Sequence, residues 1–505
     1  MLAKVTSFAL YGLQGLPISV EVDVFNGMPS FEIVGLADTA VKESKERVRS
    51  AIKNSGRHFR NGKITINLAP ADIKKQGAYL DLAIAMGILK AQGEEGLIDF
   101  SDYVMLGELS LDGSLRGVNG IMPILISAKS LGYTKFIIPK ENEYESSYIS
   151  GTTIYALNSL KEVIELLTNN KEFTPVSEKE YSVDNQGEEF ACDLSYVKGQ
   201  AFCKRALEVD VSGGHNMLMV GPTGAGKTMI AKCIPTIMPD MSFGEALETT
   251  KIHSVAGLLN SNEGIVTKRP FMTPHHTATN TALIGGGPNA LPGIISLAHN
   301  GVLYLDEMPE YTRSTLESLR QPLDDRVITV SRAKASVQYP ASFMLCGSMN
   351  PCPCGNFGIK DKICNCTTSQ ISKYKSKLSA PLLDRIDIQV SVEGVKYDDL
   401  TTETLEESSS QVKRRVNMAR KIQLERFKDD NITTNAQMSE KHLKKYCKLS
   451  KECEDIIKMS FETLNLSARA RTRIIKVART IADLDFSEEI KPKHVLESIG
   501  YRSNI

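Results

Sequence analysis

The first 170 residues alternate between short apolar runs and longer segments with helical periodicity. Lys63 to Leu68 alternates apolar and polar side chains, which is the period of a half-buried strand. Thr39 to Asn54 is charged and amphipathic and stops near Gly56, so we expect a helix there. Tyr79 to Leu89 is mostly apolar and predicts a buried helix. The pattern predicts a mixed α/β domain over residues 1–170.

A polar, acidic stretch follows this domain and has no sustained apolar period, which is typical of a linker. Beyond it, the apolar runs Met217 to Val220, Gly301 to Leu305 and Phe343 to Met349 predict three buried strands of a second α/β domain. From about Val395 the pattern becomes helical. The expected organisation is residues 1–170 as the first domain, 171–190 as the linker, 191–393 as an α/β core and 394–505 as a helical lid.

A glycine-rich loop follows the first of these strands and fits the pattern G-x-x-x-x-G-K-[ST] at every fixed position. The loop consists of Gly221, Pro222, Thr223, Gly224, Ala225, Gly226, Lys227 and Thr228. Its glycines let successive backbone N–H groups point at a polyphosphate, and the helix predicted after it presents its positive end. Lys227 is expected to reach the β- and γ-phosphates, and the Thr228 hydroxyl to bind Mg²⁺. The motif predicts a site for a nucleoside triphosphate.

Polar side chains end the other two apolar runs. Asp306 and Glu307 follow the second run, where Asp306 is expected to hold Mg²⁺ and Glu307 to take a proton from the attacking water. Asn350 ends the third run, where an amide can orient that water against the γ-phosphate. The competing interpretation of Asn350 is a turn residue before Pro351. With the glycine loop, these residues predict an NTPase.

Composition places few limits on the function. Lys plus Arg equals Asp plus Glu at 60 each, so any nucleic-acid contact has to come from a local patch. No apolar run approaches the length of a membrane span, and the first residues lack the apolar core of a signal peptide. We therefore expect a cytoplasmic protein without membrane contact, in which the ten cysteines are reduced thiols or metal ligands.

Four of these cysteines are clustered as C-x-C, nine residues, C-x-C. They are Cys352, Cys354, Cys364 and Cys366. Four thiolates in so short a loop could close a tetrahedral Zn²⁺ site, and Gly355 and Gly358 would let the loop turn. A cluster of reduced thiols explains the same residues equally well.

Two segments of the core are candidates for the lining of a pore. The first is residues 268–287, which are rich in glycine, threonine and histidine. The second reads as a hairpin that pairs Val327 to Val330 with Ser336 to Tyr339, with Arg332 and Lys334 at its tip. These cations could contact DNA phosphates, although a solvated hairpin tip accounts for them nearly as well.

The first domain resembles the peptidase domain of Lon in the segments Val104 to Gly113, Gly120 to Leu131 and Phe136 to Asn142. Lon peptidases use a serine and lysine pair, but this alignment places Tyr79 at the serine position and Met122 at the lysine position. Tyrosine and methionine cannot form a nucleophile and base pair. We therefore expect a Lon-like (ribosomal S5 domain 2-like) domain without peptidase activity.

The rest of the chain resembles AAA+ ATPases of the magnesium-chelatase-like group. The motifs that carry the resemblance are the glycine loop, the Asp306-Glu307 strand, Asn350, Leu382-Leu383-Asp384-Arg385 and Ser467-Ala468-Arg469. Thr273 to Ala278, Ile284 to Gly287, Ile295 to Gly301 and Asn350 to Gly355 are similar to the YifB/ComM family. This similarity covers essentially all 505 residues.

The resemblance implies roles for two arginines. Arg385 matches the arginine finger, which acts in the site of a neighbouring subunit, and Arg469 matches the sensor-2 arginine of the lid. An arginine finger that acts in the site of a neighbouring subunit implies a ring of subunits. The family resemblance implies that this ring is a hexamer. A surface ion pair remains the alternative for both arginines, and Arg385 lies between Asp384 and Asp387.

For function, the resemblance implies ATP-driven DNA helicase and branch-migration activity during natural transformation. The implied partners are single-stranded and branched DNA, together with recombination proteins that bind the N-terminal domain. The alternative is an AAA+ remodelling ATPase of the magnesium-chelatase type that acts on a protein partner. A metal-insertion ATPase would need a porphyrin-binding partner, and a proteolytic machine would need the serine and lysine that Tyr79 and Met122 replace.

Overall fold

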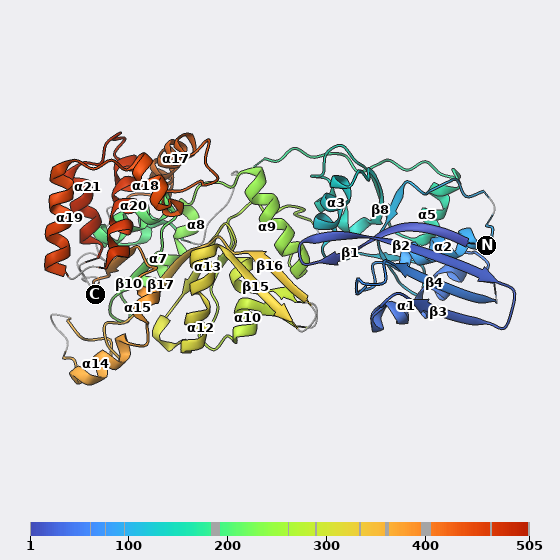
Figure 1. Cartoon of the computed structure of the whole chain (residues 1–505), viewed down its shortest axis with the longest axis horizontal. Coiled ribbons are helices and arrows are strands. Elements are labelled where there is room, and N and C mark those ends of the chain that lie inside the picture. Colours follow the sequence, from blue (N-terminus) through green and yellow to red (C-terminus); the bar gives the residue numbers. More distant parts are fainter. Residues whose placement is uncertain are drawn as a thin grey trace.

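The computed structural model places an N-terminal α/β domain beside a second α/β domain that carries a helical lid (Figure 1). It describes residues 2–60, 62–75, 77–94, 96–182, 192–260, 262–287, 290–332, 335–358, 363–394, 406–464 and 467–502. No helix in these ranges is both long enough and apolar enough to cross a membrane.

The N-terminal domain is built on a seven-stranded mixed sheet with the order β3-β4-β2-β1-β5-β8-β9. Its long hairpin, β1 and β2, and the neighbouring β4 are antiparallel, whereas the remaining pairs are parallel. The strands are β1 Leu2–Tyr11, β2 Gln14–Phe25, β3 Ser30–Val34, β4 Lys63–Ala69, β5 Tyr103–Met105, β8 Lys135–Pro139 and β9 Thr153–Leu157. The helices of eight or more residues are α1 Thr39–Asn54, α2 Asp81–Ala91, α3 Ile121–Ser130 and α5 Leu160–Leu167. The mixed α/β prediction is confirmed.

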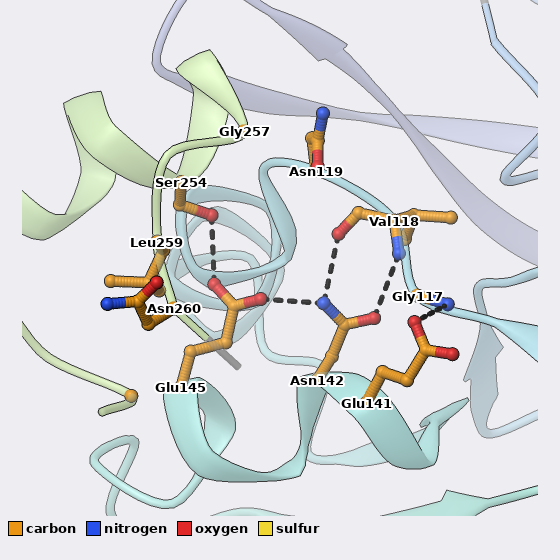
Figure 2. Close-up of a pocket in the computed structure, with 11 residues that line it drawn as sticks. Gly117, Val118, Asn119, Glu141, Asn142, Glu145, Ser254, Gly257, Leu259 and Asn260 are labelled. Carbon is orange, nitrogen blue, oxygen red and sulfur yellow. Dashed lines mark hydrogen bonds between the residues drawn. The ribbon is translucent and has the colours of Figure 1, made fainter. Parts of the chain in front are cut away.

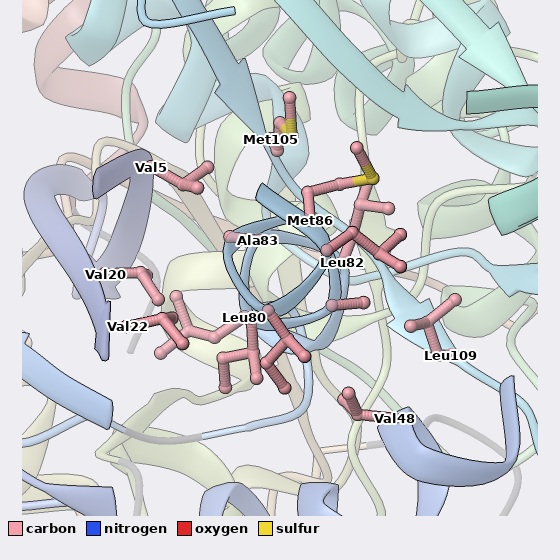
Figure 3. Packing of buried hydrophobic residues seen from close by; sticks show 14 of the residues in the cluster. Val5, Val20, Val22, Val48, Leu80, Leu82, Ala83, Met86, Met105 and Leu109 are labelled. Carbon is pink, nitrogen blue, oxygen red and sulfur yellow. The ribbon is translucent and has the colours of Figure 1, made fainter. Parts of the chain in front are cut away.

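Helix α2 forms the centre of this domain. Almost every side chain of α2 is buried, and Figure 3 shows Val20, Val22 and Val48 gathered around Ala83 and Met86. The helix lies against both β1 and β2. Because it is apolar on all sides, its sequence lacks the amphipathic period of a surface helix. The buried helix predicted for Tyr79 to Leu89 is confirmed, displaced by two residues.

The second domain contains a five-stranded, all-parallel sheet with the order β11-β14-β17-β10-β18. The strands are β10 Met217–Val220, β11 Phe271–Met272, β14 Val302–Leu305, β17 Met344–Met349 and β18 Ile388–Ser391. All residues of β10, β14 and β17 are buried. The three predicted strands are confirmed, and the carboxyl ends of β10, β14 and β17 meet at one edge of the sheet.

The lid consists mainly of α17 Ser409–Arg426, α18 Glu440–Tyr446, α19 Lys451–Leu464, α20 Ala468–Leu484 and α21 Pro492–Gly500. Helices α17 and α20 both pack on α6 Ala201–Gly213 of the core. Val416 and Ile481 of the lid belong to the same buried cluster as Met217 of the sheet. The lid and the α/β core thus share part of one hydrophobic core.

The predicted hairpin is present as β15 Val327–Arg332 and β16 Ala335–Pro340. It contacts the N-terminal domain, because the Tyr11 hydroxyl donates a hydrogen bond to the Ser336 carbonyl (3.5 Å). Leu13, in the turn between β1 and β2, packs against the apolar cluster that contains Ile328 and Val337 of the hairpin.

A second contact joins the two domains at α9 Phe243–Ala256 (Figure 2). Ser254 of α9 donates a hydrogen bond to the buried Glu145 carboxylate (2.8 Å), which also accepts from the Asn142 side chain (2.7 Å). The Gly120 N–H, at the start of α3, donates to the Ser254 carbonyl (3.1 Å). Burial raises the pKa of Glu145 despite these donors. A polar cavity of about 150 Å³ lies beside this contact.

The segment predicted as a linker begins along the N-terminal domain. The Val176 N–H donates to the Ile154 carbonyl (2.8 Å), and the Lys179 N–H donates to the Ser147 carbonyl (2.9 Å). The Tyr181 hydroxyl then donates to the Met241 carbonyl of the second domain (2.8 Å). The later part of the predicted linker, residues 183–190, lies outside the described residues.

Candidate nucleotide-binding site

The glycine loop connects β10 to helix α7 Lys227–Lys232, as the motif requires. Gly224 and Gly226 have φ angles of +81° and +86°, a region that side chains with a Cβ rarely adopt. No heavy atom lies within 4 Å of the position that a Cβ would take at either glycine. The two glycines are therefore required by backbone conformation and not by packing.

Lys227 crosses this loop and reaches the end of β17. Its Nζ donates to the carbonyls of Gly221 (2.6 Å) and Pro222 (2.8 Å) and to Oδ1 of Asn350 (3.1 Å). Burial lowers the pKa of Lys227, although the carboxylates of Asp306 and Glu307 act in the opposite direction. The structure thus brings together a lysine and an amide that are 123 residues apart in the sequence.

Thr228 and Asp306 also meet at this edge. The Thr228 hydroxyl donates to Oδ2 of Asp306 (2.9 Å), and the Ser348 hydroxyl donates to Oδ1. Burial opposes ionisation of Asp306, but the hydrogen bonds from Ser348 and Thr228 hold its pKa below the ordinary value. A hydroxyl beside an ionised carboxylate is the kind of hard oxygen donor set that Mg²⁺ takes in nucleotide sites. The residues fit Mg²⁺ on this ground.

Glu307 lies next to this pair in an unusual backbone conformation. Its φ of +49° is in the left-handed region, which non-glycine residues seldom occupy and which occurs often in functional sites. Its N–H donates to Ser348 Oγ (3.2 Å) and to Asp306 Oδ1 (3.1 Å), whereas its side chain is exposed. The carboxylate therefore faces solvent, and its charge acts to raise the pKa of Lys227.

Ser348 is a site residue that the sequence did not reveal. It is fully buried on β17 and bridges the Asp306 side chain and the Glu307 backbone. One signal was available, because Ser348 precedes Asn350 by two residues and alternate residues of a strand point to the same side.

The two arginines lie apart from these groups. Arg385, just after the short helix α15 Ala380–Leu383, is buried and forms a two-pronged ion pair with Asp324, with Nε at 3.0 Å from Oδ1. Its Nη1 also donates to the Pro381 carbonyl (2.6 Å). Arg469, near the start of α20, is exposed. Within the described residues, neither arginine is hydrogen-bonded to the phosphate loop, Asp306 or Glu307, so one chain holds only part of the predicted catalytic set.

The pairing of Arg385 differs from what its sequence neighbours suggest. Its ionic partner is Asp324, not the adjacent Asp384 or Asp387. Asp387 is paired instead with Arg473, and its carboxylate also lies 3.5 Å from the His215 ring. Burial opposes this ionisation, but Arg473 and His215 hold the pKa of Asp387 well below its ordinary value.

The four clustered cysteines lie just beyond Asn350, and their Sγ atoms are all within 4.8 Å of one another.

Of the two predicted DNA contacts, Lys334 lies outside the described residues. Arg332 ends β15, where its backbone pairs with Ala335.

The positions that Lon peptidases use for catalysis belong to a hydrophobic cluster. Met122 is fully buried in it, and Tyr79 packs against it. The Tyr79 hydroxyl accepts a hydrogen bond from the Leu10 N–H (3.5 Å), and burial raises its pKa to about 12. These two side chains serve the packing of the N-terminal domain.

The sheet is parallel, and a phosphate loop, an acidic strand end and a polar strand end meet at one of its edges. This combination defines the class of the protein, which is that of the AAA+ P-loop ATPases. Three family models match in sequence order: subunit ChlI of Mg-chelatase over residues 20–142, magnesium chelatase subunit ChlI over residues 193–400, and the C-terminal domain of magnesium chelatase subunit ChlI over residues 406–502. The class is thus magnesium-chelatase-like.

Relatives of similar length narrow this class to one family. The chain is 39% identical to the competence protein ComM of Haemophilus influenzae, over 100% of this chain and 98% of ComM. It is 41% identical to YifB of Escherichia coli, over 99% of this chain and 97% of YifB. A more distant match, 29% identical, joins 36% of this chain to 35% of Lon protease 2 of Bacillus subtilis. The chain belongs to the YifB/ComM family of magnesium-chelatase-like AAA+ ATPases.

Proposed function

We propose that this chain hydrolyses ATP at subunit interfaces of a ring and uses the energy to move DNA strands in recombination. The observation that carries the ATPase part is the convergence of Lys227, Asn350, Thr228 and Asp306 at one sheet edge. The DNA part is supported by full-length similarity to ComM, whose name marks it as a competence protein.

Each residue at this edge has a role in hydrolysis. The amides of the glycine loop and the positive end of α7 bind the phosphates. When they are bound, Lys227 donates its hydrogen bonds to phosphate oxygens in place of the loop carbonyls. Thr228 and Asp306 hold Mg²⁺, which neutralises charge on the phosphates when bound. Glu307 accepts a proton from the attacking water, and Asn350 orients that water.

The arginines complete the site from outside this set. Arg385 of a neighbouring subunit stabilises charge on the transferred phosphoryl group, and Arg469 contacts the nucleotide from the lid. In this chain Arg385 is held by Asp324, so assembly has to exchange that ion pair for a contact with the neighbouring site. This arrangement favours a closed ring, and we propose a hexamer.

We propose single-stranded and branched DNA as the substrates, with Arg332 and Lys334 of the hairpin as DNA contacts. We further propose that recombination proteins bind the N-terminal domain and that the protein works in the cytoplasm during natural transformation. The alternative is an AAA+ ATPase that remodels a protein partner. No observation on the described residues favours that alternative specifically.

The test compares ATP hydrolysis, strand displacement and four-way-junction migration by the intact chain with those of Lys227→Ala. A DNA motor is expected to show hydrolysis stimulated by single-stranded or branched DNA, binding that weakens with added salt, and junction migration that requires ATP. Lys227→Ala should lose ATP hydrolysis, strand displacement and junction migration while keeping its fold. Robust ATP hydrolysis that ignores DNA, with no strand movement at low salt, would reject the DNA role and favour a protein substrate.

A further inference from the structure

The four clustered cysteines come together without forming part of a hydrophobic core. Cys352 is buried, but Cys354 is exposed and Cys364 and Cys366 are half-buried. Thiols that pack as small hydrophobes are normally buried, as Cys203, Cys233 and Cys346 are in the sheet domain. Apolar burial therefore does not account for the convergence.

The distances between the sulfurs match a metal site. Sγ of Cys352 lies 3.4 Å from that of Cys354 and 3.7 Å from that of Cys364, and the Cys354 and Cys364 sulfurs are 3.7 Å apart. Cys366 joins them within the 4.8 Å limit that all four share. Four thiolates about 2.3 Å from one Zn²⁺ lie roughly 3.8 Å apart in a tetrahedron, whereas disulfide sulfurs are about 2.05 Å apart. The spacing is that of a tetrahedral thiolate site.

The loop around these cysteines also has the local structure of a metal site. The Phe357 N–H donates to Cys352 Sγ (3.3 Å), a hydrogen bond that stabilises a thiolate bound to a cation. Gly355 and Gly358 both have φ of +78°, which turns the chain back on itself. The described residues between Asn350 and Thr367 form no helix or strand that could hold the loop by itself.

We propose that Cys352, Cys354, Cys364 and Cys366 bind one structural Zn²⁺. All four positions are taken by protein sulfur, which leaves no open coordination position for catalysis. Sulfur ligands in this number select Zn²⁺ or iron among the common metals. We assign Zn²⁺ because the cluster is a single four-cysteine site suited to holding a loop in place.

The proposed site is positioned to hold the nucleotide pocket together, an inference that rests on the proposed ATPase function. Cys352 follows Asn350 by two residues, and a Cβ placed on Gly355 would lie 3.1 Å from the Thr223 hydroxyl of the phosphate loop. The cysteine loop therefore continues directly from β17 and approaches the phosphate loop at Gly355. Zn²⁺ at this place fixes the distance between Asn350 and the phosphate loop.

The experiment measures metal per chain by mass spectrometry of the intact protein, without nucleotide. We expect about one Zn²⁺ per chain in the wild type and in the control Cys192→Ser, and loss of Zn²⁺ in Cys354→Ser and Cys364→Ser. Because these variants could fail to fold, a mercurial thiol reagent is also titrated into the wild type. The amount of Zn²⁺ released should rise in proportion to the modification of four thiols and be complete when all four have reacted. Iron in place of Zn²⁺, or no metal after growth with added Zn²⁺, would overturn the assignment.

A second measurement tests the link to the nucleotide pocket. Removal of Zn²⁺ from the wild type is expected to lower the rate of ATP hydrolysis at least about tenfold, and Zn²⁺ addition under reducing conditions to restore it. An unchanged rate after complete removal would overturn the structural link. Since metal content is measured without ATP, its outcome is independent of whether the chain is an ATPase.

Discussion

Ser348 provides a sharp test of how the acidic strand end is positioned. Its hydroxyl donates to Asp306 Oδ1 and accepts the Glu307 N–H (3.2 Å), so Ser348→Ala removes one bond from each. A hydrogen bond to a charged group contributes about 1.5–3 kcal/mol, and each 1.4 kcal/mol is a factor of ten. We therefore expect kcat/KM for MgATP to fall roughly 10- to 100-fold, the range found when groups that orient metal ligands are lost.

The assay is phosphate release at varied MgATP, with binding of a fluorescent ATP analogue measured separately in the absence of Mg²⁺. Hydrolysis should fall while Mg²⁺-free binding stays the same, because no hydrogen bond joins Ser348 to Lys227 or to the glycine loop among the described residues. Ser296→Ala is the matched control. Ser296 is equally buried, and its hydroxyl has no hydrogen-bond partner among the described residues.

The Ser348 prediction fails if Ser348→Ala hydrolyses MgATP within twofold of the wild type under conditions where Thr228→Ala is strongly impaired. In that case Asp306 would be held by Thr228 and the backbone alone. If Ser348→Ala and Ser296→Ala lower the thermal stability by the same amount but only Ser348→Ala lowers the hydrolysis rate, then lost packing does not explain the slower hydrolysis.

Three further predictions concern the proposed proton acceptor, the proposed arginine finger and a buried acid. Glu307→Gln should keep ATP binding and lose about 10²- to 10⁴-fold in turnover, because an amide cannot accept the proton; unchanged turnover would remove its role as base. Arg385→Ala should lose about 10³-fold or more in turnover, and mixing it with Lys227→Ala should restore part of the activity if the finger acts in trans. Burial and the Asp387 charge raise the pKa of Asp210, so the folded chain keeps a proton that the unfolded chain releases above about pH 4. The free energy of unfolding should then fall by about 1.4 kcal/mol per pH unit as the pH rises toward the raised pKa, and Asp210→Asn should lack this slope in urea titrations at about pH 5 and pH 8.

The sheet and the phosphate loop could be predicted because both depend on local sequence. A parallel strand buried on both faces is a continuous apolar run, so β10, β14 and β17 are visible without any knowledge of their partners. The phosphate loop is fixed by glycines at positions that need a positive φ. The hairpin could be found because its two strands are close in the sequence.

Contacts between distant segments could not be predicted in the same way. Arg385 and Asp324 are 61 residues apart, and an arginine flanked by two carboxylates gives no sign that a third one is its partner. Ser254 and Glu145 are 109 residues apart, so their contact depends on how the two domains dock. Helix α2 began two residues later than predicted because a helix that is apolar on all sides has no polar face to mark its ends.

The docking of the N-terminal domain bears on the role of a Lon-like domain that lacks the peptidase pair. Glu145 is buried among neutral donors, so any movement of α9 that withdrew Ser254 would leave a buried carboxylate with fewer hydrogen bonds. The hairpin is also tied to this domain through Tyr11 and Ser336. A conformational change that moves α9 or the hairpin therefore has to carry the N-terminal domain with it or break the contact at that element. The Lon-like domain is thus coupled mechanically to α9 and to the hairpin of the second domain, although it lacks the peptidase pair.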